Sequence, residues 1–265
     1  MVINRLKPEQ PRRLVISGAS SGLGLALARR YLEQGATVAA YARRGELMQT
    51  LSTDFPGQAF CYTLDVRDSP AIQEAAKDFI SRAGVPDVVI ANAGVSTGTF
   101  TEYFEDIDAF QQVMDINVLG IVKTFQPYVA AMRAARRGTL VGIASVAGFR
   151  GLPGASAYSA SKAAAISYLE SLRVELHGSG VKVVTICPGY IKTPMTGVNP
   201  YAMPFIMDAD DAAKRIAHAI ERQTSFAVIP WQMGLVGRVL KCMPRWLYDS
   251  LLAKAPHKPR LHSKE

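Results

Sequence analysis

The chain has 265 residues, 49% of them hydrophobic, which is enough for the core of one of the larger α/β domains. Its three cysteines, Cys61, Cys187 and Cys242, lie far apart, and its four histidines follow no motif and are expected at the surface or in the tail, which excludes a disulfide framework and a metal site. The net charge of +8 comes without a nucleic-acid motif, and no stretch resembles a signal peptide or a membrane span, so we expect no nucleic-acid partner and a reducing, cytoplasmic location.

A glycine-rich turn follows the first expected strand, residues 14–17. It reads G-A-S-S-G-L-G from Gly18 to Gly24 and leads into an amphipathic helix that ends near Gln34. A strand, a glycine turn and a helix in succession leave free backbone N–H groups at the start of the helix, where a pyrophosphate can bind. An ordinary glycine-containing turn is the alternative, and the flanking strand and helix favour dinucleotide binding.

The second expected strand, residues 36–42, ends in Ala42 and is followed by Arg43 and Arg44. A protein that binds NAD places an acidic residue near this position to hold the ribose hydroxyls. Two arginines at the start of a helix oppose the helix dipole, whereas a guanidinium is well suited to the 2′-phosphate of NADP. A solvated arginine pair is the alternative, and we favour NADP(H).

The third expected strand, residues 59–64, ends at Asp65 and Val66, where a carboxylate can accept a hydrogen bond from the adenine amine. Ser69 is then expected to cap a helix that has Pro70 in its first turn.

The fourth expected strand, residues 87–90, is followed by an Ala-Asn-Ala-Gly turn that alone indicates little. A long helix is expected over residues 107–135, and it carries Asn117 among apolar neighbours. A buried amide needs partners, so Asn117 is either a structural hydrogen-bonding group or part of a water chain, and the sequence leaves both open.

The fifth expected strand, residues 138–145, ends at Ser145, and the next helix carries Tyr158 and Lys162. Residues four apart lie on one face of a helix, so the phenol and the ammonium point into one space. A tyrosine that exchanges protons at neutral pH needs its pKa lowered by about 2 to 3 units, and a nearby cation can supply much of this shift. Ser145 can hold the reacting oxygen by a hydrogen bond. Alone, the pair also fits a solvated helix face.

The sixth and the last expected strands, residues 181–186 and 225–229, complete an alternation of strands and helices. This alternation predicts an α/β fold, a doubly wound single-domain parallel sheet with helices on both faces. Ligands of such sheets bind beyond the carboxyl ends of the strands. The polar and glycine residues described above all follow strand ends, which indicates a single site.

In their order and spacing these motifs resemble those of the short-chain dehydrogenase/reductase family over residues 12–230. The resemblance is carried by Gly18-x-x-x-Gly22-x-Gly24, Asp65, Asn92-Ala93-Gly94, Asn117, Ser145, Tyr158-x-x-x-Lys162, and Pro188-Gly189 followed by Thr193. It implies a Rossmann-type fold and hydride transfer between NAD(P) and a carbonyl or an alcohol. Ala91 and Ser17 depart from the usual family residues without changing this expectation.

The resemblance also implies roles for the site residues. Four catalytic residues are expected: Tyr158 as general acid in reduction and base in oxidation, Ser145 polarising the substrate oxygen, Lys162 binding the nicotinamide ribose, and Asn117 holding a proton-relay water. The expected cofactor-binding residues are Gly18, Ser20, Ser21, Gly22, Leu23, Gly24, Arg43, Arg44, Asp65, Val66, Asn92, Ala93, Gly94, Tyr158, Lys162, Pro188, Gly189, Ile191 and Thr193.

An apolar segment, residues 196–207, resembles the substrate lid of the family. It carries no charge before Asp208, so a small hydrophobic, uncharged substrate is expected. Lys192 and Arg150 are the nearby cations that argue against this inference.

We divide the chain into an N-terminal segment, residues 1–13, a dinucleotide-binding and catalytic domain, residues 14–230, and an apolar, basic helical C-terminal extension and tail, residues 231–265. Residues 231–254 combine apolar residues at helical spacing with arginines and lysines, which suits peripheral contact with an anionic membrane. Packing on the protein's own pocket or on a neighbouring subunit is favoured, because apolar helical stripes usually face a core.

The expected function is that of an NADP-dependent oxidoreductase acting on a hydrophobic carbonyl or alcohol. One alternative is a 3-oxoacyl reductase of chains on a carrier protein or lipid, for which Arg133, Arg136 and Arg137 offer a basic docking site. A solvated basic helix end, which the helix dipole stabilises, is the favoured interpretation of this cluster. A second alternative is a non-catalytic NADP-binding sensor or scaffold. By analogy with the family we expect a homo-oligomer, either a dimer or a tetramer.

Overall fold

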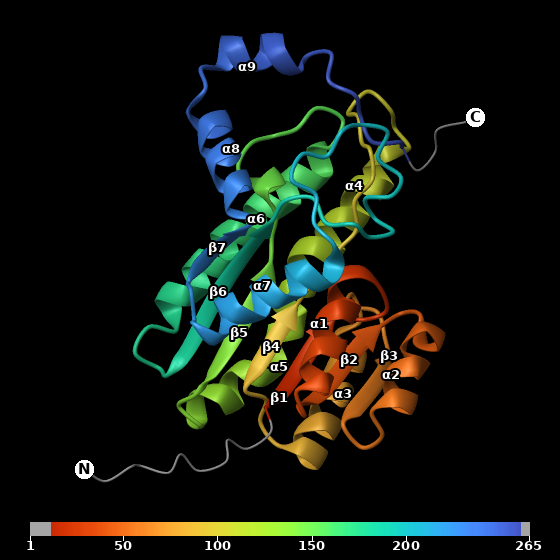
Figure 1. The fold of residues 1–265 in the computed structure, drawn as a ribbon, viewed down its shortest axis with the longest axis vertical. Coiled ribbons are helices and arrows are strands. Elements are labelled where there is room, and N and C mark those ends of the chain that lie inside the picture. Colours follow the sequence, from red (N-terminus) through yellow and green to blue (C-terminus); the bar gives the residue numbers. More distant parts are fainter. Residues whose placement is uncertain (1–11, 261–265) are drawn as a thin grey trace.

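The computed structural model describes residues 12–260, which are built around a parallel β-sheet (Figure 1). Its strands lie in the order β3-β2-β1-β4-β5-β6-β7, and each neighbouring pair is parallel. The strands are β1 (Arg13–Ser17), β2 (Thr37–Ala42), β3 (Ala59–Thr63), β4 (Val88–Ala91), β5 (Gly138–Ile143), β6 (Val181–Pro188) and β7 (Phe226–Ile229). The predicted doubly wound Rossmann-type sheet is confirmed. Most of the predicted N-terminal segment, residues 1–13, lies outside the described residues.

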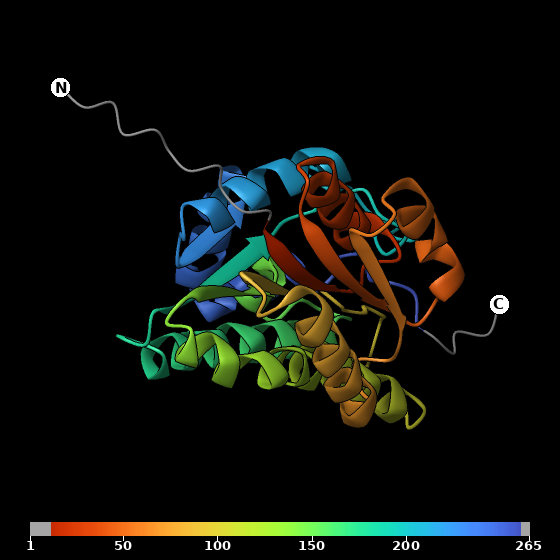
Figure 2. The same ribbon diagram turned by 90° about the horizontal axis from the view of Figure 1, so that it is seen from below.

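Helices cover both faces of the sheet (Figure 2). One face is covered by α1 (Gly22–Glu33), α2 (Gln49–Asp54) and α7 (Ala209–Glu221), and the other by α3 (Ser69–Ala83), α4 (Asp106–Met114), α5 (Gly120–Ala134) and α6 (Ser156–Glu175). This arrangement follows from the strand sequences, which are apolar on both faces and are therefore stable only between two helical layers.

The hydrophobic core consequently has two layers, one on each side of the sheet. Ile16 packs with Leu27 and Ile216 on the α1 and α7 side, whereas its neighbour Val15 packs with Phe125 on the α5 side. All five of these side chains are completely buried or nearly so. Burial of each such side chain stabilises the fold by about 1.5–3 kcal/mol, so the two layers together hold the strand ends in fixed relative positions.

One local prediction, the cap of α3, was wrong. The Asp68 carboxylate accepts a hydrogen bond of 3.0 Å from the Ala71 N–H, so Asp68, and not Ser69, caps α3. A carboxylate is the better cap because it also interacts favourably with the helix dipole. The helix expected over residues 107–135 contains a π-helical turn, Asp115–Leu119, between α4 and α5. Such turns often occur at functional sites, and this one carries Asn117.

The C-terminal extension folds as α8 (Trp231–Cys242) and α9 (Arg245–Leu252), and α8 packs against β7. The Arg150 guanidinium donates hydrogen bonds to the carbonyls of Leu240 and Met243 at the end of α8, the latter at 2.7 Å. These are the carbonyl groups that a helix leaves without partners. Within residues 12–260, no helix combines the length and the apolar character needed to cross a membrane.

Candidate active site

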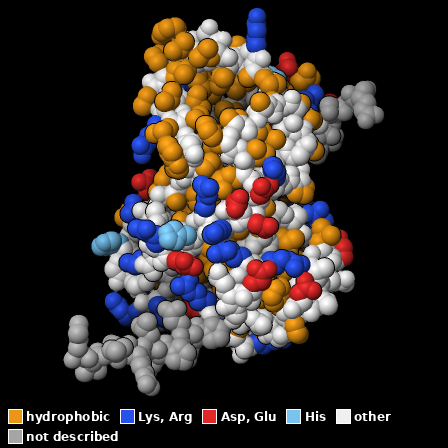
Figure 3. All heavy atoms as spheres, in the orientation of Figure 1, with side chains coloured by type: hydrophobic (Ala, Val, Ile, Leu, Met, Phe, Trp, Pro, Cys, Tyr) orange, Lys and Arg blue, Asp and Glu red, His pale blue; other side chains and the backbone are white. Residues whose placement is uncertain are grey.

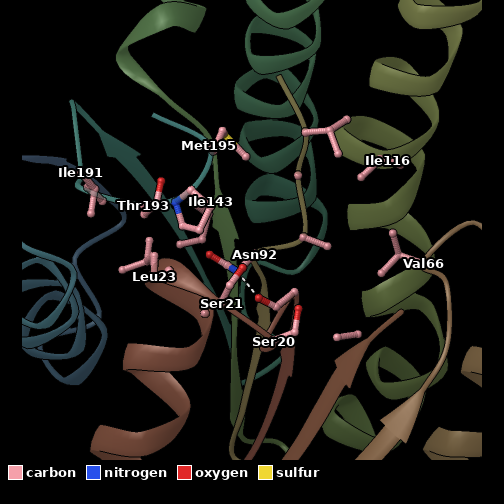
Figure 4. A pocket seen from close by; sticks show the side chains of 18 of the residues that line it. Ser20, Ser21, Leu23, Val66, Asn92, Ile116, Ile143, Ile191, Thr193 and Met195 are labelled. Atoms are coloured by element: carbon pink, nitrogen blue, oxygen red, sulfur yellow. Dashed lines mark hydrogen bonds between the residues drawn. The ribbon is translucent and has the colours of Figure 1, made fainter. Parts of the chain in front are cut away.

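A cleft opens at the carboxyl ends of the strands, where residues that follow each strand from β1 to β6 meet. Every site residue expected from the sequence borders this cleft except Asn117. The strand order changes direction between β1 and β4, and open α/β sheets bind their ligands at such a switch point. Figure 4 shows side chains from the start of α1, from the end of β4 and from the segment after β6 around one cavity.

The glycine turn brings the start of α1 to the floor of the cleft. Gly18 has a φ of +72°, a conformation that favours glycine, and a Cβ atom on Gly24 would overlap the carbonyl oxygen of Gly18. Ser21 precedes α1 without capping it through its side chain, and the first turn contains no acidic residue. The backbone N–H groups at this helix N-terminus therefore suit an anionic pyrophosphate.

Ser17 and Asn92 hold the end of β4 against this turn. The Ser17 hydroxyl accepts hydrogen bonds from the backbone N–H groups of Asn92 and Ala93, at 3.1 and 3.2 Å. The Asn92 side chain donates to the carbonyls of Ser17 and Gly18, at 3.0 and 3.2 Å. The Asn-Ala-Gly motif thus forms part of the framework of the site. The family usually has threonine where this chain has Ser17, and the hydroxyl common to both residues is the group that makes these hydrogen bonds.

Two arginines lie at the rim of the cleft beyond β2. The Arg43 side chain is 54% exposed and lies 4.0 Å from Asp65, and Arg44 donates a hydrogen bond of 3.2 Å to the Ser21 hydroxyl. Arg67 binds the Asp65 carboxylate at 2.8 Å, and this hydrogen bond lowers the pKa of Asp65. Because Asp65 is already paired with Arg67, the exposed Arg43 guanidinium keeps most of its hydrogen-bonding capacity for an anion.

Ser145, Tyr158 and Lys162 meet on the other side of the cleft. The Ser145 hydroxyl accepts a hydrogen bond of 3.1 Å from the Ala147 N–H and lies 3.5 Å from the Pro188 carbonyl. Tyr158 lies in the first turn of α6, and Lys162 lies one turn later with its ammonium 5.7 Å from the centre of the phenol ring. The Lys162 ammonium donates to the carbonyl of Ile143 at 2.9 Å. The three side chains come from two separate elements and border one space.

The shift in the pKa of Tyr158 is opposite in sign to the sequence expectation. Burial raises the pKa of Tyr158, and the interaction with Ser145 lowers it only in part. Burial also lowers the pKa of Lys162 to about 8. Desolvation disfavours the charged form of each group, and it is the largest cause of both shifts. The phenol is therefore protonated at neutral pH.

Asn117 lies behind the cleft, completely buried in its π-helical turn. Its side-chain oxygen accepts a hydrogen bond of 2.8 Å from the Val95 N–H, and its amide donates to the Val95 carbonyl and to the Ser161 hydroxyl, both at 3.0 Å. These bonds match the structural alternative, since they fix the segment after β4 against α6. A part in proton transfer remains a prediction.

The segment between β6 and α7, which contains the expected substrate lid, lines one side of the cleft. Two backbone hydrogen bonds close its base, from Lys192 N–H to Met207 O at 2.8 Å and from Met207 N–H to Tyr190 O at 3.0 Å. Lys192 forms an ion pair of 2.9 Å with Asp208, and Arg150 is bound to the end of α8. Neither of the two cations that argued against an uncharged substrate borders the cleft.

Several residues that line the cleft were not singled out in the sequence. They are Tyr41, Leu64, Val95, Ile116, Ile143, Ala144, Pro194 and Met195. Most of them adjoin an expected site residue at a strand end, which is the signal that could have identified them. Ile116 does not follow a strand, because it reaches the cleft from the π-helical turn in the helical layer.

Comparisons with known proteins agree with this geometry. Residues 12–201 match the family model of the short chain dehydrogenases. The chain is 38% identical over 244 residues to an uncharacterized oxidoreductase of Myxococcus xanthus, covering 90% of this chain and 95% of the relative. It is 35% identical over 184 residues to a 2-dehydro-3-deoxy-L-rhamnonate dehydrogenase (NAD(+)) of a Sphingomonas species, covering 69% of this chain and 74% of the relative.

A solved structure with the same architecture is that of a short-chain dehydrogenase from Streptomyces avermitilis. It superimposes with a TM-score of 0.78 at 26% sequence identity, covering 94% of this chain and 99% of that chain. The protein is thus an α/β oxidoreductase with a nicotinamide coenzyme site. More particularly, the chain belongs to the short-chain dehydrogenase/reductase family.

Proposed function

We propose that the protein transfers a hydride between NADP(H) and a hydrophobic carbonyl or alcohol, with Tyr158 as the general acid and base. The observation that carries the proposal is that Ser145, Tyr158 and Lys162 border the same cleft as the glycine turn before α1. Burial of an ammonium destabilises a fold, so a buried lysine in a cleft calls for a functional explanation. A sensor or scaffold that only binds NADP has no need of a buried lysine beside a tyrosine and a serine, so catalysis is the better explanation.

The three side chains divide the chemistry of reduction among them. When bound, the reduced nicotinamide supplies the hydride. The Tyr158 phenol, which carries its proton at neutral pH, donates that proton to the carbonyl oxygen. The Ser145 hydroxyl lies only at the limit of a hydrogen bond to Pro188, so it can turn and donate to the same oxygen. In oxidation of an alcohol, Tyr158 first releases its proton to solvent, and the phenolate then accepts the proton of the alcohol hydroxyl.

Lys162 is the third side chain of this arrangement. Its ammonium, anchored on the Ile143 carbonyl at 2.9 Å, is the group expected to bind the nicotinamide ribose. With its pKa lowered to about 8, Lys162 is still mostly protonated at neutral pH, and a bound hydroxyl can replace part of the solvation that burial removed.

The preference for NADP(H) is supported by the rim beyond β2. Strand β2 ends in Ala42, which offers no carboxylate to ribose hydroxyls, and two guanidiniums follow it. The nearby Asp65 is paired with Arg67. One relative carries NAD(+) in its name, so the coenzyme has to be decided by experiment on this chain.

The test is to measure oxidation of NADPH and of NADH separately over carbonyl compounds that range from short and polar to long and apolar. We expect NADPH and an apolar carbonyl to be preferred. Arg43→Ala should weaken NADPH binding by about tenfold or more, the loss of a hydrogen bond to a charged group, and leave NADH binding unchanged. Arg215→Ala, an exposed arginine on α7, is the matched control. Equal losses with both coenzymes would contradict the phosphate assignment.

A 3-oxoacyl reductase remains a narrower version of the same chemistry, but the basic cluster offers it little support. Arg133, Arg136 and Arg137 lie at the end of α5 and just before β5. The cleft lies at the carboxyl ends of the parallel strands, whereas this cluster lies at the amino end of β5. The six residues of β5 separate the two ends by about 20 Å. A carrier docked at this cluster would present its acyl chain at the wrong edge of the sheet.

Peripheral contact with an anionic membrane is supported by the outer face of α8. Trp231, Leu235 and Val239 recur every four residues and are 51–64% exposed, and Arg238 and Lys241 lie beside them. Figure 3 shows apolar side chains gathered over α8 and α9. An apolar stripe flanked by cations suits an interfacial helix, and the opposite side of α8 packs on the domain.

Flotation with phosphatidylcholine vesicles, with and without phosphatidylserine, tests this contact. We expect the wild type to float with the anionic vesicles and Leu235→Gln/Val239→Gln to remain at the bottom. Val174→Gln, at an exposed valine on α6, should float like the wild type. If the double variant instead changes only the oligomeric state, measured by light scattering, the stripe is a contact between subunits of the expected homo-oligomer.

A further inference from the structure

The chain returns to the substrate side of the cleft after α9. Residues 253–260 run from α9 past the segment that follows β4 and the segment that follows β6 (Figure 1). The Pro259 carbonyl accepts a hydrogen bond of 2.9 Å from the Gly98 N–H, and Gly98 and Arg260 form a parallel bridge. Segments more than 150 residues apart in the sequence thus lie side by side.

Residues 255–260, which we call the C-terminal strap, contact three loops that leave the carboxyl edge of the sheet. The strap touches the loop after β4 through Gly98 and through Phe100, whose ring meets His257 edge-on at 5.2 Å. It touches the loop before α6 where His257 lies against Gly154. It touches the loop after β6 through Met195. One short segment therefore links all three loops on the substrate side.

Arg260 anchors the far end of the strap. Its Nε donates to both carboxylate oxygens of Asp106, at 2.9 and 3.1 Å, and its guanidinium stacks 3.5 Å from the centre of the Tyr103 ring. Asp106 is only 3% exposed and also accepts a hydrogen bond of 2.8 Å from the Phe100 N–H. A buried pair of this kind is destabilising to break, so the strap is a fixed part of the structure.

Lys258 connects the strap to the cleft itself. Its side chain is buried, with the residue only 9% exposed, and its ammonium donates a hydrogen bond of 2.9 Å to the Met195 carbonyl. Met195 borders the cleft (Figure 4). Among residues 12–260, no carboxylate forms an ion pair with Lys258. An ammonium that is buried with a carbonyl and no carboxylate as its partner destabilises the fold. What this hydrogen bond does is fix the position of the Met195 backbone.

We propose that the C-terminal strap forms a wall of the substrate pocket and that Lys258 is a positioning residue, which sets substrate affinity by holding Met195 in place. The inference rests on the proposed function, because it assigns the substrate to the side of the cleft that the strap covers. Within residues 12–260, the hydrogen bond of the Lys258 ammonium goes to Met195, so we expect Lys258 to act on substrate binding and not on the proton transfer.

Two variants loosen this wall by different means. Lys258→Met keeps the length of the side chain and removes the donor to Met195. Gly98→Ala leaves Lys258 intact, but its Cβ atom would overlap the Lys258 carbonyl oxygen and push the strap away. Gly98 does not have a positive φ, so alanine causes no backbone strain of its own there. Lys254→Met, an exposed lysine just after α9, is the control.

For each variant we would measure the KM for an apolar carbonyl, kcat, the Kd of NADPH, and amide hydrogen exchange of residues 193–207. Lys258→Met and Gly98→Ala should raise KM by about five- to tenfold, the loss of one hydrogen bond to a charged group, and speed exchange in that segment. The values of kcat and of the NADPH Kd should stay within about twofold. Lys254→Met should behave as the wild type.

The outcomes separate this inference from the proposed function. Unchanged KM and unchanged exchange in both variants would overturn it, and so would a parallel loss of NADPH binding, which indicates general destabilisation. If the wild type reduces no carbonyl, the proposed function is wrong, and faster exchange in residues 193–207 would still establish that Lys258 holds this segment.

Discussion

The two sides of the cleft are built in different ways. On the coenzyme side, the backbone of a seven-residue turn and the strand ends beside it form the surface, and glycines make the close approach possible. On the substrate side, side chains join segments far apart in the sequence, by 63 residues for Lys258 and Met195 and by 154 for Arg260 and Asp106. The coenzyme side therefore depends on a local backbone shape, and the substrate side depends on long-range contacts.

Tyr158 stands where the two sides meet, and its replacement should have the largest effect. Tyr158→Phe removes the proton donor and should lower kcat by about 10³-fold, within the usual range for loss of a general acid. Binding of NADPH, followed by fluorescence or calorimetry, should stay within about twofold of the wild type, because the coenzyme side is intact. Tyr168→Phe, in the same helix and outside the cleft, is the control. Turnover that survives Tyr158→Phe would refute the proposed chemistry.

Gly24→Ala tests the backbone construction of the coenzyme side. The added Cβ atom would overlap the Gly18 carbonyl and approach the Asn92 amide, so the turn has to shift. We expect a loss of about 1–3 kcal/mol in the free energy of unfolding, typical of overpacking, together with weaker coenzyme binding. Gly151→Ala has open space around its Cβ position and should change neither quantity. If Gly24→Ala binds NADPH normally, the close approach does not matter for the coenzyme.

The buried lysine provides the third prediction, through the dependence of stability on pH. Below pH 8 Lys162 is charged in both the folded and the unfolded state, and burial of that charge destabilises the fold. Between about pH 8 and 10.5 the folded state releases the proton first, so stability should rise with pH over this window. By pH 9.5 the gain should be about 2 kcal/mol.

Chemical denaturation of the wild type and of Lys162→Met between pH 7.5 and 9.5 measures this effect. Methionine has a similar length and no charge, so the variant should be the more stable protein at pH 7.5, and the difference should shrink as the pH rises. A difference that stays constant over this range would mean that the lysine is not desolvated as its position indicates.

The sequence allowed the fold and the location of the site to be predicted well, and the reasons are local. Apolar runs such as residues 14–17 form strands because both of their faces are buried, and the glycine turn predicts the start of α1 from backbone geometry alone. The residues after each strand could be assigned to one edge because all the strands are parallel. The expected contact of Arg43 with a phosphate is of the same local kind and still awaits its test.

The parts that the sequence did not predict depend on contacts between distant residues. His257 was expected at the surface or in the tail, and the sequence did not indicate that its ring packs on Phe100 within the C-terminal strap. The pKa of Tyr158 was expected to fall and rises, because the degree of burial in the first turn of α6 is a property of the packed molecule. Neither spacing nor composition carries this information, since both describe neighbours along the chain.

By itself, then, the sequence determined the alternation of strands and helices, the glycine turn and the set of side chains that we propose for catalysis. It could do so because hydrophobic periodicity and backbone sterics act over a few residues. Only the tertiary structure decided which groups are desolvated, which cations are already paired and which segment covers the substrate side. Those properties arise from long-range packing, where the contact of Lys258 with Met195 exists only once the whole chain has folded.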